Sequence, residues 1–174
     1  DKAINVLQGR CVGGSTTVNW TSSFRTPATT LEHWRSHFGL ADYGYEALVP
    51  WFEQAERRLN VGPWLMAPNR NNELLRKGAT SLGIQAPMIK RNVKGCWNLG
   101  SCGMGCPTNA KQSMLVTTIP AALERGATLF VQTRVETLQM QADRIESLRC
   151  IPVALDGSAA GAPATTVRAR HVVV

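Results

Sequence analysis

Residues 9–20 read GRCVGGSTTVNW and contain the pattern on which the interpretation of the chain depends. Two adjacent glycines, Gly13 and Gly14, precede three hydroxyl residues, a valine and Asn19. Glycine permits a positive φ and lets backbone N–H groups approach an anion or a ring edge closely. Serine and threonine can equally be ordinary turn residues. Taken alone, the stretch predicts either a tight turn or a backbone cradle for a ligand.

The composition is that of a globular chain with a basic surface. The chain has 174 residues, of which 44% are hydrophobic and 18% are charged, and its net charge is +7. The basic residues are scattered rather than clustered, so a solvated surface is favoured over nucleic-acid binding. No apolar run approaches the roughly 20 residues of a membrane helix. The start of the chain lacks a signal-peptide core, so a cytoplasmic location is expected.

Both ends suggest a piece of a longer protein. The chain starts at Asp1 without a methionine and ends in three valines, 172–174, without a terminator. Consecutive β-branched residues predict a buried strand, and such strands usually lie inside a fold. We therefore expect a single incomplete domain.

Hydrophobic periodicity predicts helices first and strands later. Residues 84–112, with many turn formers and three cysteines, predict a long ordered loop. A tight turn at 141–143 and a flexible loop at 156–163 would join the strands into an antiparallel β-meander. The expected helices run from Thr29 or Thr30 to Gly39, over 45–59, over 71–82 and over 113–125, and the expected strands cover 129–132, 135–140, 145–155 and 165–174.

Capping residues set the expected helix ends. Thr29 or Thr30 is expected to cap the first helix, and Gly39 to end it. Pro50 is expected in the first turn of the second helix, where a missing N–H is tolerated. Gly83 and Gly126 are expected to close the third and fourth helices.

The glycine-rich stretch resembles the N-terminal signature of the glucose–methanol–choline flavin oxidoreductases. In that family a glycine pair, two small hydroxyl residues, an aliphatic residue and an asparagine wrap the flavin. Ser23 departs from the pattern, because the family usually has an aromatic residue there and Phe24 follows one position later. The matching positions are Gly9, Arg10, Val12, Gly13, Gly14, Ser15, Thr16, Val18 and Asn19.

A second block follows the same family's order. In that family a helix leads into a β-meander, and a valine equivalent to Val135 meets the adenine of FAD through its backbone. The resemblance covers residues 7–174, and two ordered motifs about 110 residues apart are more specific than one. The matching segments are 106–113, 117–122, 125–127 and 133–135.

The resemblance implies an α/β fold, as a partial FAD/NAD(P)-binding Rossmann-like domain. Residues 1–27 would be a flavin-contacting loop segment, 28–112 a cap-like helical and loop excursion, and 113–174 a helix plus β-meander returning to the FAD domain. A Cβ at Gly13 or Gly14 would hold the flavin ring away. Some members bond flavin covalently through a histidine where this chain has Val18, so non-covalent FAD is implied. The implied cofactor-binding residues are Val12, Gly13, Gly14, Ser15, Thr16, Val18, Asn19 and Val135.

Two parts of the family pattern are missing. The Gly-x-Gly-x-x-Gly turn that binds the FAD pyrophosphate does not occur, and Gly100–Gly105 lacks its spacing. The family's catalytic histidine lies in a C-terminal region that this chain does not contain. The resemblance implies a dehydrogenase or oxidase that passes hydride from a CH–OH group of an alcohol or sugar to flavin N5. This chain is expected to hold none of that enzyme's catalytic residues. The electron acceptor is undetermined.

Cysteines and histidines offer a second interpretation. Cys96, Cys102 and Cys106 form C-x5-C-x3-C and could ligate an iron–sulfur cluster or zinc in an electron-transfer module, or form one disulfide. Structural or free thiols are favoured, because Trp97 stands where a cluster-binding subgroup has an adjacent cysteine. His33 and His37, spaced i,i+4, could form half a metal site, but surface histidines are favoured and no metal is expected.

Overall fold

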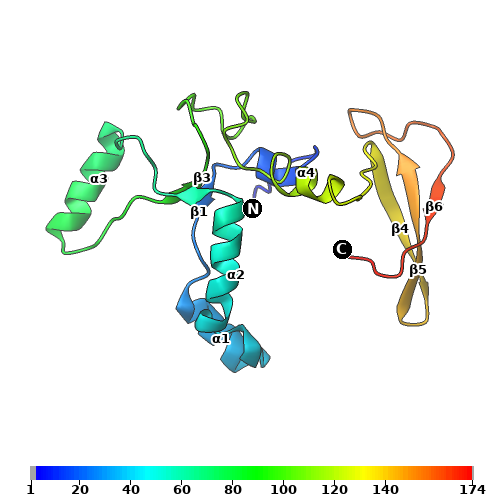
Figure 1. Cartoon of the computed structure of the whole chain (residues 1–174), viewed down its shortest axis with the longest axis horizontal. Helices are drawn as coiled ribbons and strands as arrows, with labels where there is room; N and C mark the ends of the chain where they lie inside the picture. Colours follow the sequence, from blue (N-terminus) through cyan, green and yellow to red (C-terminus); the bar gives the residue numbers. More distant parts are fainter. Residues whose placement is uncertain (1–2, 174) are drawn as a thin grey trace. The chain divides into compact units, whose positions relative to one another are not determined.

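The protein is represented by a computed structural model that describes residues 3–173 and contains helices and antiparallel sheets (Figure 1). The chain forms two compact units, Asp1–Gly126 and Ala127–Val174. No helix within residues 3–173 combines the length and apolar character needed to cross a membrane. The first unit holds η1 (Gly14–Thr17), β1 (Ser22–Ser23), α1 (Ala28–Phe38), η2 (Ala41–Tyr43), α2 (Tyr45–Arg58), β2 (Val61–Gly62), α3 (Arg70–Ser81), β3 (Lys90–Asn92) and α4 (Thr118–Leu123), and the second holds β4 (Thr133–Gln141), β5 (Arg144–Pro152) and β6 (Thr165–Val167).

A small antiparallel sheet in strand order β1-β3-β2 organises the first unit. Arg91 in the central strand pairs with Ser22 on one side and with Gly62 on the other. The sequence predicted a loop over 84–112, so β3 was missed. Strands of two or three residues are too short to show the alternation by which strands are recognised.

The start of α1 corrects the expected cap. Thr29 and Thr30 lie inside the helix, and the residue before its first turn is Pro27, whose side chain makes no capping hydrogen bond. Gly39 ends the helix as predicted, with a φ of 68°. A left-handed residue at this position is a common helix terminator, and glycine adopts it without a Cβ penalty.

Helix α2 confirms the predicted element but not the place of its proline. Pro50 is the sixth residue of Tyr45–Arg58 and therefore lies beyond the first turn. A proline there cannot donate to the carbonyl of Glu46, so one internal hydrogen bond of the helix is not made. Helix α3 agrees with the prediction within one residue at each end, and the side chain of Asn69 caps it by accepting from the Asn72 N–H at 2.9 Å.

Helix α4 is shorter than the predicted 113–125. It covers Thr118–Leu123, and the preceding residues form turns in which the Ser113 carbonyl accepts hydrogen bonds from Val116 and Thr117, each at 3.1 Å. Gly126 follows with a φ of 87°. The turn before α4 brings residues 113–115 against the glycine-rich loop.

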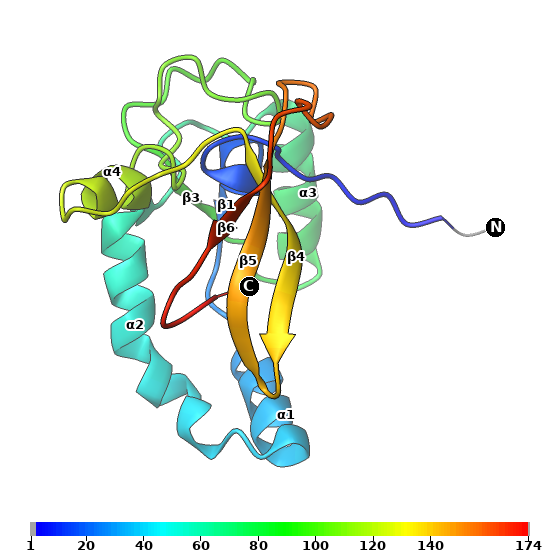
Figure 2. The same ribbon diagram turned by 90° about the vertical axis from the view of Figure 1, so that its right-hand side faces the viewer.

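The second unit is an antiparallel meander, as predicted, in strand order β4-β5-β6 (Figure 2). The long pair β4 and β5 is closed by a tight turn at Ala142, whose φ is 50°. The pairing register shifts between Val135 and Thr137, which places a bulge immediately after Val135.

Two strand predictions in this unit were wrong. Residues 129–132 are not a strand, because β4 begins at Thr133. The final strand covers only Thr165–Val167 instead of 165–174. Val173 is 97% exposed, and Val174 lies outside the described residues, so a buried terminal strand is not observed.

All pairs between the named strands are antiparallel, so the mixed helix and sheet class is confirmed. The parallel sheet of a Rossmann-like domain remains a prediction. The buried part of the first unit is notably polar, because Lys111, Ser113 and Thr21 are each at most 3% exposed. This polar interior lies directly behind the glycine-rich loop.

Candidate flavin-contacting site

The glycine-rich loop adopts a compact left-handed turn. Gly13 and Gly14 have φ values of 90° and 54°, and the Gly14 N–H donates to the carbonyl of Cys11 at 2.8 Å. The 3-10 helix η1 begins at Gly14. Residues with a Cβ rarely adopt such a φ, which explains a pair of glycines at this point.

The two glycines share a positive φ but differ in what an added side chain would meet. A Cβ on Gly13 would lie 2.7 Å from the Thr17 Oγ1 and 2.9 Å from the Leu115 nitrogen, so the chain itself excludes a side chain there. A Cβ on Gly14 would have no protein atom within 4 Å. The loop therefore packs on the chain at Gly13 and presents an open face at Gly14.

The hydroxyl residues shape the loop from within. Ser15 Oγ accepts a hydrogen bond from the Gly9 N–H at 3.0 Å. Thr16 Oγ1 donates to the Gly13 carbonyl and accepts from the Met114 N–H at 3.0 Å. The Thr16 hydroxyl thus joins the loop to the turn before α4, almost 100 residues later in the chain.

Lys111 binds the loop through its ammonium group. Its ammonium donates to the carbonyl oxygens of Thr17 at 2.7 Å and Asn19 at 2.8 Å, and also to the carbonyl of Cys102. The residue is only 2% exposed. Hydrogen bonds from a charged donor are stronger than neutral ones, so Lys111 holds both ends of the Thr17–Asn19 segment.

Burial lowers the pKa of Lys111, because desolvation disfavours the charged ammonium, and the nearby Arg91 guanidinium lowers it further. The cysteines around it act in the opposite direction. Sequence reasoning missed this residue. Its only signal was a lysine within the second matching motif, and sequence spacing does not reveal that three backbone carbonyls converge on one side chain.

The structure gives the positions of the other predicted cofactor-binding residues, but their role in binding stays a prediction. Val12 and Val18 are partly buried, and Asn19 is exposed with its Oδ1 accepting from the Thr21 N–H at 3.1 Å. Val135 pairs with Cys150 in the second unit and is about half exposed. The first unit brings residues 12–19 together in one loop, whereas Val135 belongs to the other unit, so a shared site stays a prediction.

The cysteine-rich segment holds free thiols. Cys96, Cys102 and Cys106 are all partly exposed and unpaired by disulfides. Within residues 3–173, no group of three or more His, Cys, Asp or Glu side chains is arranged to hold a metal ion. A zinc or iron–sulfur module that uses these cysteines stays an alternative hypothesis.

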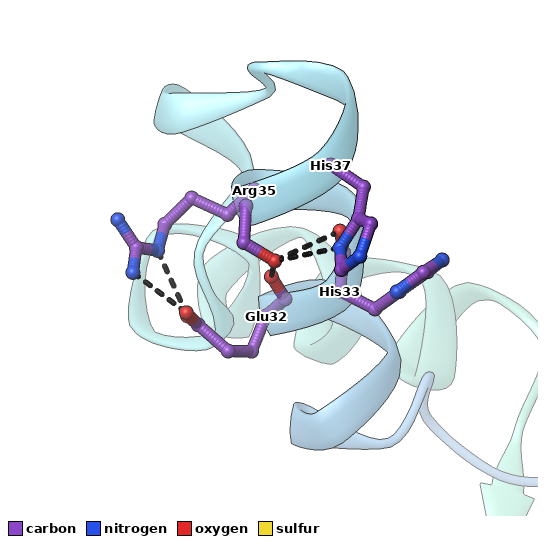
Figure 3. A network of polar contacts seen from close by, with 5 residues as sticks. Glu32, His33, Arg35 and His37 are labelled. Carbon is purple, nitrogen blue, oxygen red and sulfur yellow. Dashed lines mark hydrogen bonds and ion pairs between the residues drawn. The ribbon is translucent and has the colours of Figure 1, made fainter.

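The histidine pair lies on the exposed surface of α1. The rings of His33 and His37 are 4.1 Å apart between centroids, and His37 Nδ1 lies 3.0 Å from the Ser36 hydroxyl (Figure 3). The nearest charged neighbours on the helix, Glu32 and Arg35, bind each other in a two-pronged ion pair. The Glu32 carboxylate is thus engaged by Arg35 rather than by the histidines.

Comparison with known proteins decides the family. The GMC oxidoreductase family model matches residues 1–174. The chain belongs to the GMC oxidoreductase family. Members of this family with similar sequences include two uncharacterized GMC-type oxidoreductases, one of Mycobacterium tuberculosis, 36% identical over 84% of this chain, and one of Sinorhizobium fredii, 31% identical over 81%. A long-chain-alcohol oxidase of Arabidopsis thaliana is 31% identical over 79%.

This GMC chain covers only a part of those relatives. It spans 24% of the Mycobacterium protein, 28% of the Sinorhizobium protein and 18% of the Arabidopsis protein. Membership confirms the resemblance drawn from the two motifs. A flavin cofactor is expected for a protein of this family.

Proposed function

We propose that this chain forms part of the FAD-binding region of an oxidoreductase that oxidises CH–OH groups of an alcohol or sugar. The proposed FAD is bound non-covalently, since Val18 offers no nucleophile. The electron acceptor stays open. The residues proposed to contact FAD are Val12, Gly13, Gly14, Ser15, Thr16, Val18, Asn19 and Val135.

The observation that carries the proposal is the open face of the loop at Gly14. Behind the loop, Lys111 and Met114 hold Thr17 and Thr16 in place through hydrogen bonds. In front of Gly14, a Cβ would meet nothing within 4 Å. A rigid backbone with a bare outer surface is suited to lie against a flat ring or a pyrophosphate. The residues present therefore fit a flavin.

When bound, the flavin would supply the acceptor of a hydride, at N5, from the carbon that carries the substrate hydroxyl. The loop residues would bind and orient the ring system through preorganised backbone groups. The partly buried Val12 and Val18 would help to exclude water from it. We assign no proton-transfer step to this chain, because the family's catalytic histidine corresponds to sequence outside it.

The proposal is tested by the flavin content of the purified intact protein that contains this chain, because the chain alone is expected to bind FAD weakly or not at all. We expect absorbance near 450 nm, a general flavin property, and release of FAD on denaturation. A protein that is folded but free of flavin, and that takes up none on incubation with FAD, would contradict the proposal.

A matched pair of variants tests the loop. Gly14→Ala adds a methyl group to the open face, whereas Gly39→Ala adds one at the end of α1, where φ is also positive and nothing lies within 4 Å. Each strains the backbone by about 1–2 kcal/mol. We expect only Gly14→Ala to weaken FAD binding, by at least about tenfold, which corresponds to about 1.4 kcal/mol. Equal losses in the two variants would exclude a flavin contact at Gly14.

A further inference from the structure

The three clustered cysteines line one small cavity in the first unit. The cavity measures about 200 Å³ and is walled by Trp20, Trp64, Trp97 and neighbouring loop residues. Cys96, Cys102, Cys106 and Arg91 contribute to the same wall, and no Asp, Glu or His lines it. A cavity with several thiols, one cation and no carboxylate favours the deprotonated state of a thiol.

The sulfur atoms receive different sets of donors. Cys106 Sγ accepts from the Lys111 N–H at 3.4 Å and lies 3.6 Å from the Thr108 hydroxyl. Cys102 Sγ accepts from Nη2 of Arg91 at 3.3 Å. Cys96 Sγ accepts a single backbone N–H, from Asn98, at 3.4 Å. Cys106 alone combines a backbone donor with a neighbouring hydroxyl.

The surroundings of Cys106 stabilise its thiolate. Burial on its own raises the pKa of the Cys106 thiol, but hydrogen bonds from the Lys111 and Thr108 backbone and from the Thr108 hydroxyl outweigh burial, so the pKa lies below its ordinary value. The buried ammonium of Lys111, which donates to the Cys102 carbonyl, adds positive charge to the same region. Thiolate character and access together decide which thiols are oxidised.

We propose that this cavity is a thiol modification site, at which hydrogen peroxide oxidises Cys106 to a sulfenic acid. The Cys106 thiolate attacks one peroxide oxygen, an S–O bond forms and the O–O bond breaks. The sulfur loses two electrons, and the leaving hydroxide takes a proton to become water. The site differs from the flavin-contacting loop and does not require the proposed function to be correct.

The cleavage pattern of the chain provides an internal control. Trypsin cuts after Lys94 and Lys111, so all three cavity cysteines fall in the single peptide 95–111. The purified protein is treated with hydrogen peroxide, sulfenic acid is trapped with a cyclic 1,3-dione, and fragment spectra assign the label. We expect Cys106 to carry at least about ten times more label than Cys96 or Cys102, as its thiolate character predicts. Equal labelling, or preference for another cysteine, would overturn the proposal.

Two serine variants separate chemistry from folding. Cys106→Ser is expected to abolish the label on the peptide, while Cys96→Ser, in the same cavity, leaves it unchanged. Loss of label in both variants, or retention in Cys106→Ser, contradicts the proposal. A further test needs no variant. The rate at which the unmodified protein is labelled should fall as the pH is lowered through the pKa of Cys106.

Discussion

The ammonium nitrogen of Lys111 lies 2.7 Å from the carbonyl oxygen of Thr17, 94 positions earlier in the chain. This contact ties the glycine-rich loop to the second of the two sequence blocks that resemble the GMC family. Two motifs that are far apart in the sequence are thus one structural unit, and the open face at Gly14 depends on the support behind it.

Removing the ammonium should loosen that support. In Lys111→Met, three backbone carbonyls lose a charged donor in a place that water reaches poorly. We expect a loss of about 3 kcal/mol in the free energy of unfolding, measured by urea denaturation, together with weaker FAD retention. Lys94→Met, at an exposed position, is the control and should change stability by less than about 0.5 kcal/mol. A stable Lys111→Met protein would show that the contacts contribute little.

The close approach at Gly13 predicts a different outcome from that at Gly14. Gly13→Ala places a methyl group against Thr17 and Leu115 at a φ of 90°. Strain and overpacking together should destabilise the protein by about 3 kcal/mol. Gly83→Ala, with a positive φ of 71° and open surroundings, should cost only about 1 kcal/mol. Equal effects on the midpoint of thermal unfolding would refute the packing argument.

The ion pair between Arg25 and Glu56 should make stability depend on acid pH. Arg25 donates to both carboxylate oxygens of Glu56, at 2.9 and 2.7 Å, and this hydrogen bonding lowers the pKa of Glu56. The stabilisation is therefore fully present above the unfolded-state pKa of about 4.3 and is lost as pH falls through the lower folded-state value.

Unfolding titrations between neutral and acid pH check this expectation. Glu56→Gln should be less stable than the unmodified protein at pH 7, and the difference should shrink as the pH drops below about 4. Glu46→Gln, at an exposed position on the same helix, is the comparison. If the difference in stability between Glu56→Gln and the unmodified protein stays constant across this range, the carboxylate charge of Glu56 does not stabilise the fold.

Pro50 offers a gain in stability. Because it lies inside α2, Pro50→Ala would allow a new N–H to reach the carbonyl of Glu46. Alanine is more favourable than proline inside a helix, which raises the free energy of unfolding of the variant by about 3 kcal/mol. The unfolded chain gains conformational freedom when proline is lost, which lowers the free energy of unfolding by about 1 kcal/mol. We expect a net increase of about 2 kcal/mol in thermal or urea unfolding. A decrease would indicate that the proline ring itself is packed or shapes the helix.

The sequence predicted elements whose signals are local. Helices α2 and α3 follow from apolar stripes, and Gly39 and Gly83 from the left-handed conformation that ends a helix. The β4–β5 hairpin follows from apolar alternation around a turn. These signals depend on neighbours within a few residues, so a single sequence contains them.

Non-local contacts account for what the sequence did not predict. The pairing of β3 with β1 and β2 joins segments of two or three residues, and α4 begins late because residues 113–117 form turns against the glycine-rich loop. The candidate site likewise contains residues that local sequence signals predicted and one residue that they did not. Glycines at 13 and 14 were recognisable from their conformational freedom, whereas Lys111 acts through carbonyls that any residue types could supply.

The distance along the chain between the loop and its support has a consequence for biosynthesis. During translation, the N-terminal loop emerges long before the residues that order it, and closing a segment of more than 90 residues carries an entropic cost that grows slowly with length. Folding of the loop therefore has to wait until the polypeptide has been made through Leu115. Cofactor capture should be a late event in maturation, and a nascent chain that ends earlier should not retain a flavin.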